Sequence, residues 1–437
     1  MTIAKKTATT AILGVALFAW ACGSEAPPEP EAAAKEAPSE PVAETPAGPT
    51  TPDQLPKGIV LSLAQFVTEA GKPVPGPARM EFLYRSKGAW KMTAMEDPES
   101  NVFHKTMVYP GEDGPVLLTM AGSEAVVKTW QLEGSALEGT EVWRKDFGGK
   151  FSRMRDAEIA DLYAADEHAI AVATHDQGVV AVLRPSPDGF SVVELDTEEN
   201  TFVHEIEVGD VNGDGQLEVY ATPSEPNKLD GGVQKGEVVR YVPKAGEGRV
   251  VVADLGDRHA KEILVEDVDG DGTDELYVAV EGHVGEFKEL VHPVEIRRYD
   301  ADTPADSGGV VIATLDDRLT RFLTAGDIDG DGKKEMVAAT FSNGLWLLRP
   351  GDDAKAEWSA ELIDKNSGGF EHASILTDLD GDGADELYVA SDKQKEVRRY
   401  VWDGQKLVRE VIYVRPDDRP IFTWNLMPVP RELIPGA

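Results

Sequence analysis

One acidic loop occurs four times in this chain, and it limits the folds that the chain can adopt. The first copy runs from Asp210 to Glu218 and reads Asp-Val-Asn-Gly-Asp-Gly-Gln-Leu-Glu; the others begin at Asp267, Asp327 and Asp378. Each copy has oxygen-bearing side chains at positions 1, 3, 5 and 9, and glycine at positions 4 and 6. Hard divalent cations such as calcium need several oxygen ligands, and glycine allows the tight turn that brings those ligands together. The repeated loop therefore predicts calcium binding.

The candidate metal ligands are the residues at positions 1, 3, 5, 7 and 9 of each loop. Position 7 varies freely, as expected if only its backbone carbonyl binds the metal. In chain order the candidates are Asp210, Asn212, Asp214, Gln216, Glu218, Asp267, Asp269, Asp271, Thr273, Glu275, Asp327, Asp329, Asp331, Lys333, Glu335, Asp378, Asp380, Asp382, Ala384 and Glu386. Because each of the four loops supplies a full set of protein oxygens, we expect about four structural calcium ions. For any single copy, an Asp/Gly turn without a metal is the alternative.

The residues that follow each loop exclude an EF-hand. An EF-hand loop ends with a bidentate glutamate at position 12 and leads into a helix. Here position 12 is Ala221, Val278, Ala338 or Val389, each inside a short apolar run. Such runs are typical of buried strands. Each loop is therefore expected to join one strand to the next.

The spacing of the loops predicts a β-propeller. The loops start at residues 210, 267, 327 and 378, at intervals of 57, 60 and 51 residues, and each interval has room for four short strands. Two further units, 101–149 and 151–197, keep the strand order without the acidic loop. At the ends of the chain, 420–428 reads as an innermost strand. Residues 59–64, 80–84 and 90–94 would complete its blade as the second, third and fourth strands. We predict an all-β propeller of seven four-stranded blades in residues 57–437, closed by the two ends, with six blades as the alternative.

The repeated loop resembles that of the FG-GAP/VCBS family, the propeller repeats of integrin α subunits and of many secreted bacterial proteins. The resemblance covers about residues 101–418, and the metal motif is present in four of the units. It implies that positions 1, 3, 5 and 9 bind calcium, although glutamate at position 9 replaces the more common aspartate. The family includes adhesion proteins, carbohydrate-binding proteins and some lyases, so the resemblance implies no single function.

The N-terminal residues resemble a bacterial lipoprotein signal. Residues 1–21 combine two lysines, a short apolar core and a small-residue cleavage site, and the only cysteine of the chain, Cys22, follows directly. Residues 22–56 are rich in Pro, Ala and Glu, a composition that favours a disordered, extended tether. We therefore expect a protein exported to the bacterial cell envelope and anchored in a membrane through lipidated Cys22, at the outer membrane or cell surface. Ordinary cleavage that leaves a free thiol is the alternative.

Charge and strand order indicate what the propeller could bind. A formal net charge of −36, without a basic stripe in the sequence, argues against nucleic acid as a partner. Cationic residues nevertheless recur at the expected starts of the innermost strands, opposite the acidic loops: Arg155, His204, Lys261, Arg321 and His372. Together they predict a cationic ring at one mouth of the central channel, suited to an anionic ligand such as a uronic acid or a sulfated sugar. Alternatively, these residues pair with neighbouring acids such as Glu205, Glu262 and Glu371.

Three functions fit these features. The first is a membrane-tethered, calcium-binding module for adhesion or for binding a glycan, an anion or a protein. The second is a polysaccharide lyase or hydrolase that acts on an acidic glycan, with His204, His372 and Arg321 as candidate site residues. The third is a structural envelope protein. The sequence contains no G-x-S-x-G, H-E-x-x-H or P-loop motif, so we expect a binding module rather than an enzyme.

Overall fold

A computed structural model of the chain describes residues 51–69, 72–100, 102–111, 113–122, 125–148, 153–175, 177–285, 289–416 and 420–437. The predicted signal, Cys22 and most of the predicted tether lie outside the described residues. Among the described residues, no helix is long and apolar enough to cross a bilayer.

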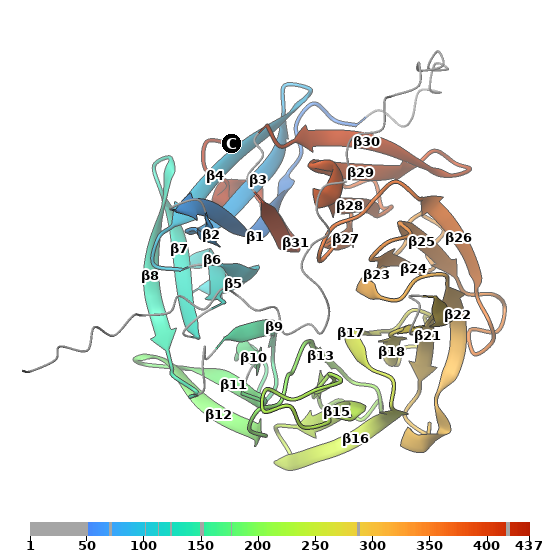
Figure 1. Cartoon of the computed structure of the whole chain (residues 1–437). Helices are drawn as coiled ribbons and strands as arrows, with labels where there is room; N and C mark the ends of the chain where they lie inside the picture. Colours follow the sequence, from blue (N-terminus) through green and yellow to red (C-terminus); the bar gives the residue numbers. More distant parts are fainter. Residues whose placement is uncertain are drawn as a thin grey trace, which may run out of the picture. The chain divides into compact units, whose positions relative to one another are not determined.

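These residues form seven antiparallel sheets arranged as the blades of a propeller (Figure 1). Blade 1 contains β5 (Phe103–Gly111), β6 (Gly114–Ala121), β7 (Val126–Glu133) and β8 (Ala136–Arg144). Blade 2 contains β9 (Met154–Ala160), β10 (Ala169–Thr174), β11 (Val179–Ser186) and β12 (Gly189–Thr197). Blade 3 contains β13 (Ile206–Gly209), β14 (Glu218–Ala221), β15 (Gly236–Val242) and β16 (Glu247–Gly256). Blade 4 contains β17 (Ala260–Glu266), β18 (Glu275–Val280), β21 (Val294–Tyr299) and β22 (Val310–Leu315). Blade 5 contains β23 (Thr320–Gly326), β24 (Glu335–Thr340), β25 (Leu345–Arg349) and β26 (Ser359–Asp364). Blade 6 contains β27 (Ser374–Thr377), β28 (Glu386–Ser391), β29 (Glu396–Trp402) and β30 (Leu407–Val414).

Blade 7 joins the two ends of the described chain. It contains β31 (Ile421–Pro430), β1 (Lys57–Glu69), β3 (Ala78–Ser86) and β4 (Ala89–Asp97), and β2 (Lys72–Pro75) extends it beside β1. β31 and β1 pair antiparallel from Lys57 opposite Pro430 to Gln65 opposite Ile421. This pairing confirms the predicted seven blades and the predicted closure, and it rules out six blades. Closure places a complete four-stranded blade between blades 6 and 1, so the ring has no gap.

The remaining elements are short. β19 (His283–Val284) and β20 (Leu290–His292) form a separate hairpin within blade 4. Three 3₁₀ turns follow β21, β28 and β31: η1 (Ala305–Ser307), η2 (Asp392–Gln394) and η3 (Arg431–Leu433).

The innermost strands β5, β9, β13, β17, β23, β27 and β31 surround the propeller axis (Figure 1). Because each blade is antiparallel, the loop after an innermost strand lies on one face and the loop after the second strand lies on the other. The four acidic loops are all of the first kind, so they share one face. The starts of the innermost strands share the opposite face.

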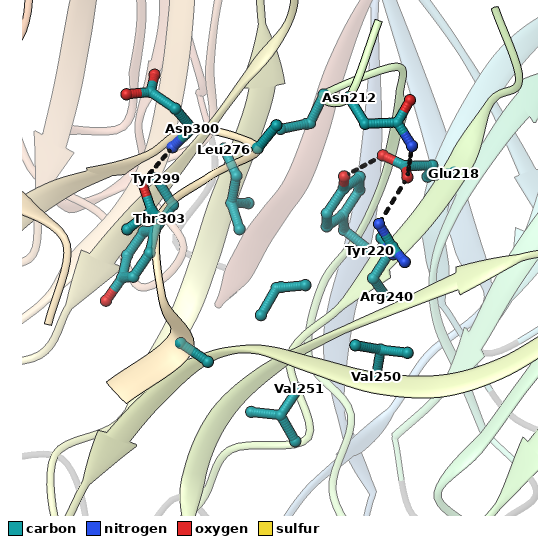
Figure 2. A pocket seen from close by; sticks show the side chains of 14 residues that line it. Asn212, Glu218, Tyr220, Arg240, Val250, Val251, Leu276, Tyr299, Asp300 and Thr303 are labelled. Atoms are coloured by element: carbon teal, nitrogen blue, oxygen red, sulfur yellow. Dashed lines mark hydrogen bonds and ion pairs between the residues drawn. The ribbon is translucent and has the colours of Figure 1, made fainter. Parts of the chain in front are cut away.

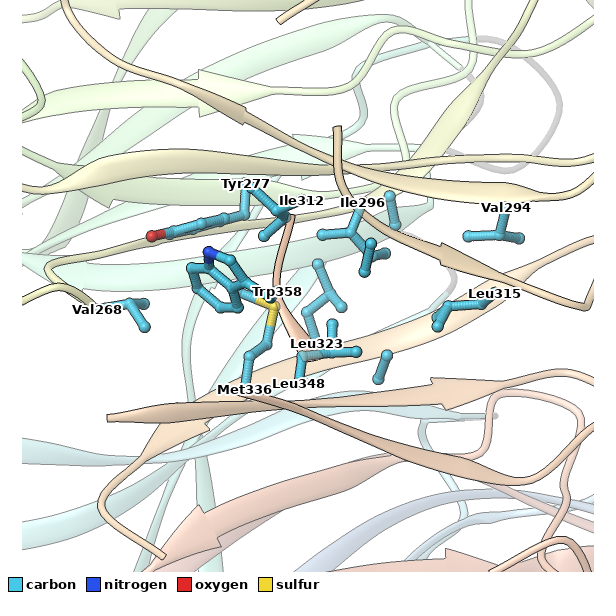
Figure 3. Close-up of a cluster of buried hydrophobic side chains, with 13 residues drawn as sticks. Val268, Tyr277, Val294, Ile296, Ile312, Leu315, Leu323, Met336, Leu348 and Trp358 are labelled. Atoms are coloured by element: carbon cyan, nitrogen blue, oxygen red, sulfur yellow. The ribbon is translucent and has the colours of Figure 1, made fainter. Parts of the chain in front are cut away.

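The hydrophobic core lies between neighbouring blades. All side chains of β10, β18, β24 and β28 are buried, as expected for second strands covered on both sides. Between blades 4 and 5, Trp358 lies between Tyr277 and Met336, with Ile312 beside it (Figure 3). Trp358 precedes β26 directly, so the connection between the third and fourth strands of blade 5 supplies the side chain that fills this interface.

Candidate metal loops and the axial cluster

The first aspartate of each acidic loop holds the turn together. Asp267 Oδ1 accepts hydrogen bonds from the backbone N–H groups of Gly270 at 2.8 Å and Asp271 at 3.0 Å, and its Oδ2 accepts one from Gly272 at 3.0 Å. Both glycines have positive φ angles, 73° and 92°, which explains why glycine occupies positions 4 and 6. The loops that begin at Asp210, Asp327 and Asp378 use their first aspartate in a similar way.

The turns bring carboxylates together in three of the four loops. Carboxylate oxygens lie within 4.8 Å of one another in three groups: Asp267, Asp269, Asp271 and Glu275; Asp327, Asp329 and Glu335; and Asp378, Asp380 and Asp382. In the remaining loop position 3 is Asn212, whose Nδ2 donates to Glu218 at 2.9 Å. A set of hard oxygen donors fits calcium, so the three acidic groups could each hold one such ion. Ion binding itself stays a prediction.

Burial affects the glutamate at position 9. Burial raises the pKa of Glu275 to about 7, whereas the Tyr277 hydroxyl, which donates to its Oε2 at 2.8 Å, and the nearby Arg298 lower it. Burial likewise raises the pKa of Glu335 and of Glu386 to about 7. A divalent cation in the loop would favour the ionised carboxylates, because metal binding requires deprotonated ligands.

An arginine of the third strand contacts each acidic loop. The four arginines are Arg240 on β15, Arg298 on β21, Arg349 on β25 and Arg399 on β29. Arg298 is 1% exposed and pairs with Asp269 at 2.7 Å and with Glu275 at 3.1 Å. The guanidinium groups therefore offset part of the charge of positions 3 and 9 before any metal binds. Sequence reasoning located these third strands but not this role, although Arg240, Arg298 and Arg399 each stand directly opposite a tyrosine two residues after the loop glutamate.

The structure divides the five residues of the predicted cationic ring into three groups. Arg155 and Arg321 both reach Glu371 Oε2, at 3.5 Å and 2.5 Å. The two arginines share this one carboxylate and hold the pKa of Glu371 below its usual value, although burial alone would raise it.

The next two residues share a second carboxylate. His204 Nε2 and Lys261 Nζ approach Glu225 Oε1 at 3.1 Å and 3.0 Å. Burial raises the pKa of Glu225, but these two neighbours lower it to about 2. The partner acid here is Glu225, which comes from the loop after β14 and was not among the acids named in the alternative. Glu371, which was named there, pairs with Arg155 and Arg321.

His372 is fully buried and belongs to a different environment. Its Nδ1 lies 2.8 Å from the Thr340 carbonyl oxygen and its Nε2 lies 2.8 Å from Ser367 Oγ. Burial lowers its pKa to about 4. The structure therefore does not place His372 with the other four residues.

Aromatic side chains gather where these strands begin. Phe341, Phe370, Phe422 and Trp424 form a contiguous group, which we call the axial cluster, and all four rings are partly exposed. Ring centroids are 6.5 Å apart for Phe341 and Phe370, 5.4 Å for Phe370 and Phe422, and 6.4 Å for Phe370 and Trp424. Sequence reasoning missed this cluster because its members come from the loop after β24, the residues before β27, and β31.

Arginines cover the faces of three of these rings. Arg155 lies 5.0 Å from the Trp424 ring, Arg321 lies 5.0 Å from Phe370, and Arg318 lies 4.8 Å from Phe341. His104 stacks on Trp424 with ring centroids 4.5 Å apart. Cations over aromatic faces are mutually stabilising and desolvate one another. The axial cluster therefore combines positive charge with partly exposed ring surface.

The innermost strands of blades 2 to 4 are acidic further along the axis. Carboxylates from β9, β13 and β17, and from the residue before β13, interact electrostatically: Asp156, Glu158, Glu205, Glu207 and Glu262. Burial and this mutual repulsion raise the pKa of Glu205 and Glu207, and burial raises that of Glu262 to about 8. Asp156 accepts a hydrogen bond of 3.2 Å from the backbone N–H of Ile206 in blade 3, and Glu262 accepts one of 2.7 Å from the backbone N–H of Leu323 in blade 5. These carboxylates join neighbouring blades.

Comparisons with known proteins support the fold alone. No protein-family model and no curated protein matches the chain, so the FG-GAP/VCBS resemblance rests on its loops. A Bacteroides uniformis protein provisionally assigned as a 6-phosphogluconolactonase is similar at 12% identity and a TM-score of 0.51, covering 86% of this chain and 100% of that one. A Lactobacillus plantarum protein is similar at 13% identity and 0.50, covering 85% and 99%. An Agrocybe aegerita lectin that recognises non-reducing terminal N-acetylglucosamine has 14% identity and 0.49, covering 85% and 96%.

Proposed function

We propose that this protein is a calcium-stabilised binding module that holds an anionic sugar at the axial cluster. The observation that carries the proposal is the placement of Arg155, Arg318 and Arg321 over partly exposed aromatic rings at one end of the propeller axis. Aromatic rings pack against the apolar face of a sugar ring, and arginine binds carboxylate or sulfate groups through paired N–H donors. A uronic acid or a sulfated sugar presents both features. The remainder of the acidic surface would repel such a ligand, which favours binding at this one place.

The FG-GAP/VCBS resemblance and the acidic loops support the structural part of this proposal. The loops lie on the face opposite the axial cluster, so calcium there would stabilise the blades without touching the ligand. In this proposal lipidated Cys22 and residues 22–56 tether the propeller to the bacterial cell envelope. Mass spectrometry of the native N-terminus tests the tether, because an unmodified Cys22 would contradict it.

The binding test uses the full-length chain with oligogalacturonate as the acidic probe and a dextran oligosaccharide as the neutral one. We expect saturable binding of the acidic probe only, measured by calorimetry. Arg318→Ala and Phe341→Ala should each weaken it by about tenfold, the effect of losing one charged or stacking contact. Arg409→Ala is the matched control, since Arg409 lies on the outer strand β30 and is 44% exposed. Equal binding of both probes, or equal loss in the Arg409 variant, would contradict the proposal.

The same titration separates binding from catalysis. New ultraviolet absorbance from double bonds, or new reducing ends, would show that the chain degrades the acidic probe and would favour a lyase or hydrolase. Binding without either signal supports a receptor for acidic sugars.

A further inference from the structure

A cavity lies between blades 3 and 4, on the side of the acidic loops. It has a volume of about 190 Å³, and it is open to the surface on one side. In Figure 2, Glu218, Tyr220 and Arg240 lie together on one side of it, whereas Tyr299 and Thr303 lie on the other, with Val250 and Val251 below. None of these residues belongs to the axial cluster, so the cavity is separate from the proposed sugar site.

Corresponding positions at two other blade boundaries are filled by an indole ring. In blades 3, 4 and 6 a tyrosine stands two residues after the loop glutamate: Tyr220, Tyr277 and Tyr388. Between blades 4 and 5, Tyr277 contacts Trp358 with ring centroids 5.7 Å apart. Between blades 6 and 7, Tyr388 contacts Trp90 at 6.4 Å. Trp358 directly precedes β26, the fourth strand of blade 5, and Trp90 lies at the start of β4, the fourth strand of blade 7. Each tryptophan therefore comes from the following blade, where its fourth strand begins.

Blade 4 has no tryptophan to place against Tyr220, and the ring that its described residues contribute to the lining of the cavity is Tyr299. The residue directly before its fourth strand is Gly309, where blade 5 has Trp358. The connection instead forms η1, and its residues Ala301, Thr303 and Ala305 line the cavity. Gly309 has a φ of 67°, and a Cβ there would lie 2.7 Å from the Tyr299 ring, so a larger residue is excluded. The chain itself therefore leaves this space open.

The lining of the cavity combines apolar side chains with polar and charged groups at its edge. Val250, Val251 and Val252 of β16 supply the accessible apolar surface, whereas Val211, Tyr220 and Leu276 line the cavity while almost fully buried. The charged groups at its edge are already paired: Arg240 with Glu218 at 3.0 Å, and Asp300 with Arg298 at 2.7 Å and Lys355 at 2.8 Å. An apolar cavity of about 150 Å³ is large enough to bind benzene. A cavity of about 190 Å³ has room for a somewhat larger ring system.

We propose that the cavity between blades 3 and 4 is a binding site for a small, uncharged, planar aromatic molecule of about the size of indole. The ligand takes the place that the Trp358 side chain occupies between blades 4 and 5. Its ring packs against Val250 and Val252 of β16, and the paired charges at the edge of the cavity exclude ionic ligands. Since Asn212 and Glu218 line the cavity and belong to the first acidic loop, calcium is held constant in the test.

The experiment titrates indole into the full-length chain and follows binding by ligand-observed NMR. We expect one saturable site in the unsubstituted protein. Ala305→Phe places a ring in the cavity and should abolish binding, whereas Ala356→Phe, in the exposed connection of blade 5, should leave it unchanged. Trp358→Ala opens the corresponding space between blades 4 and 5 and should add a second site.

Three results would overturn the proposal. They are no saturable binding by the unsubstituted protein, binding that persists in the Ala305 variant, and equal loss in the Ala305 and Ala356 variants. If the Trp358→Ala variant fails to fold, the comparison of Ala305→Phe with Ala356→Phe still tests the proposal. Indole-3-acetate, an anion of the same ring system, should bind more weakly than indole, and tighter binding of the anion would contradict the stated ligand class.

Discussion

Asp385 Oδ2 accepts a hydrogen bond of 2.9 Å from the backbone N–H of Asp327, across the boundary between blades 5 and 6. In return, the backbone N–H of Asp385 donates to the Asp327 carbonyl at 2.7 Å. Asp385 occupies position 8 of its loop, and Asp327 is the first residue of the preceding loop. Asp274 contacts Asp210 in the same way, at 2.8 Å, between blades 3 and 4. Neighbouring acidic loops are therefore linked directly.

The linkage explains a sequence difference among the four loops. A Cβ at Gly326 would lie 2.4 Å from Asp385 Oδ2, and one at Gly209 would lie 2.7 Å from Asp274 Oδ2. A loop is therefore preceded by glycine when the loop of the following blade has aspartate at position 8, because no side chain fits beside that aspartate. Between blades 4 and 5, position 8 is Lys334, and it pairs with Glu266, which stands where the other two boundaries have glycine.

Asp385→Ala should destabilise the propeller by about 1–3 kcal/mol, because it leaves the Asp327 N–H without its partner. Asp385→Asn should retain most of that stability, since its amide oxygen can accept the same hydrogen bond. Lys333→Ala, at the exposed position 7 of the neighbouring loop, is the control. Chemical denaturation measures all three variants, and equal stability of the Asp385→Ala and Lys333→Ala variants would contradict the role of the linkage.

Removal of calcium should lower the melting temperature. For a site with a dissociation constant near 10⁻⁴ M, millimolar calcium stabilises the fold by about 1.4 kcal/mol. Asp271→Ala should remove one ion from the stoichiometry measured by calorimetry, while the stability of the metal-free protein changes little because Asp271 is exposed. Identical melting with calcium and with a chelator would refute calcium binding.

Arg298→Met should destabilise the metal-free protein by about 3–5 kcal/mol, because it leaves buried carboxylates without their cation. Calcium should restore part of this loss by supplying positive charge to Asp269 and Glu275. Arg349→Met is the matched variant: Arg349 is 26% exposed, and its contacts to Asp329 and Glu335 are 3.4 Å and 3.5 Å long. We expect it to cost about 1 kcal/mol or less. Denaturation with and without calcium tests both, and equal effects would contradict the argument.

His372 should make the protein less stable in mild acid. Its pKa is about 4 in the folded state, below the value of about 6.5 for an exposed histidine, so the unfolded chain binds the proton more readily. Its contribution is fully present above pH 6.5 and is lost as the pH falls from there towards 4, amounting to about 2 kcal/mol between pH 7 and pH 5. His372→Gln should reduce this pH dependence by that amount.

The comparison is made between the two proteins at each pH, since other groups also titrate. Arg398, Asp364 and Asp317 are the charged groups that most affect the His372 ring. Parallel stability curves for the histidine and glutamine proteins would show that His372 does not contribute.

Much of this fold could be predicted from the sequence because its signals are local. Glycines at positions 4 and 6 are needed for the positive φ angles of the turn, and the apolar run after each loop forms a fully buried second strand. Even the seventh blade was predictable, because an unpaired innermost strand at one end matched the missing strand at the other. These features depend on backbone geometry and on burial patterns within about 60 residues.

Other features depend on contacts between blades, which only the tertiary structure decided. The spacing that placed His372 with the cations is the same as that of His204, but the fold buries His372 against Thr340 and Ser367. The axial cluster and the cavity beside Tyr220 arise where segments from different blades meet. Whether a side chain there faces solvent, a partner or an empty space depends on which residue the adjacent blade supplies, as Trp358 and Gly309 show. That information lies in the packing of neighbouring blades rather than in any single repeat.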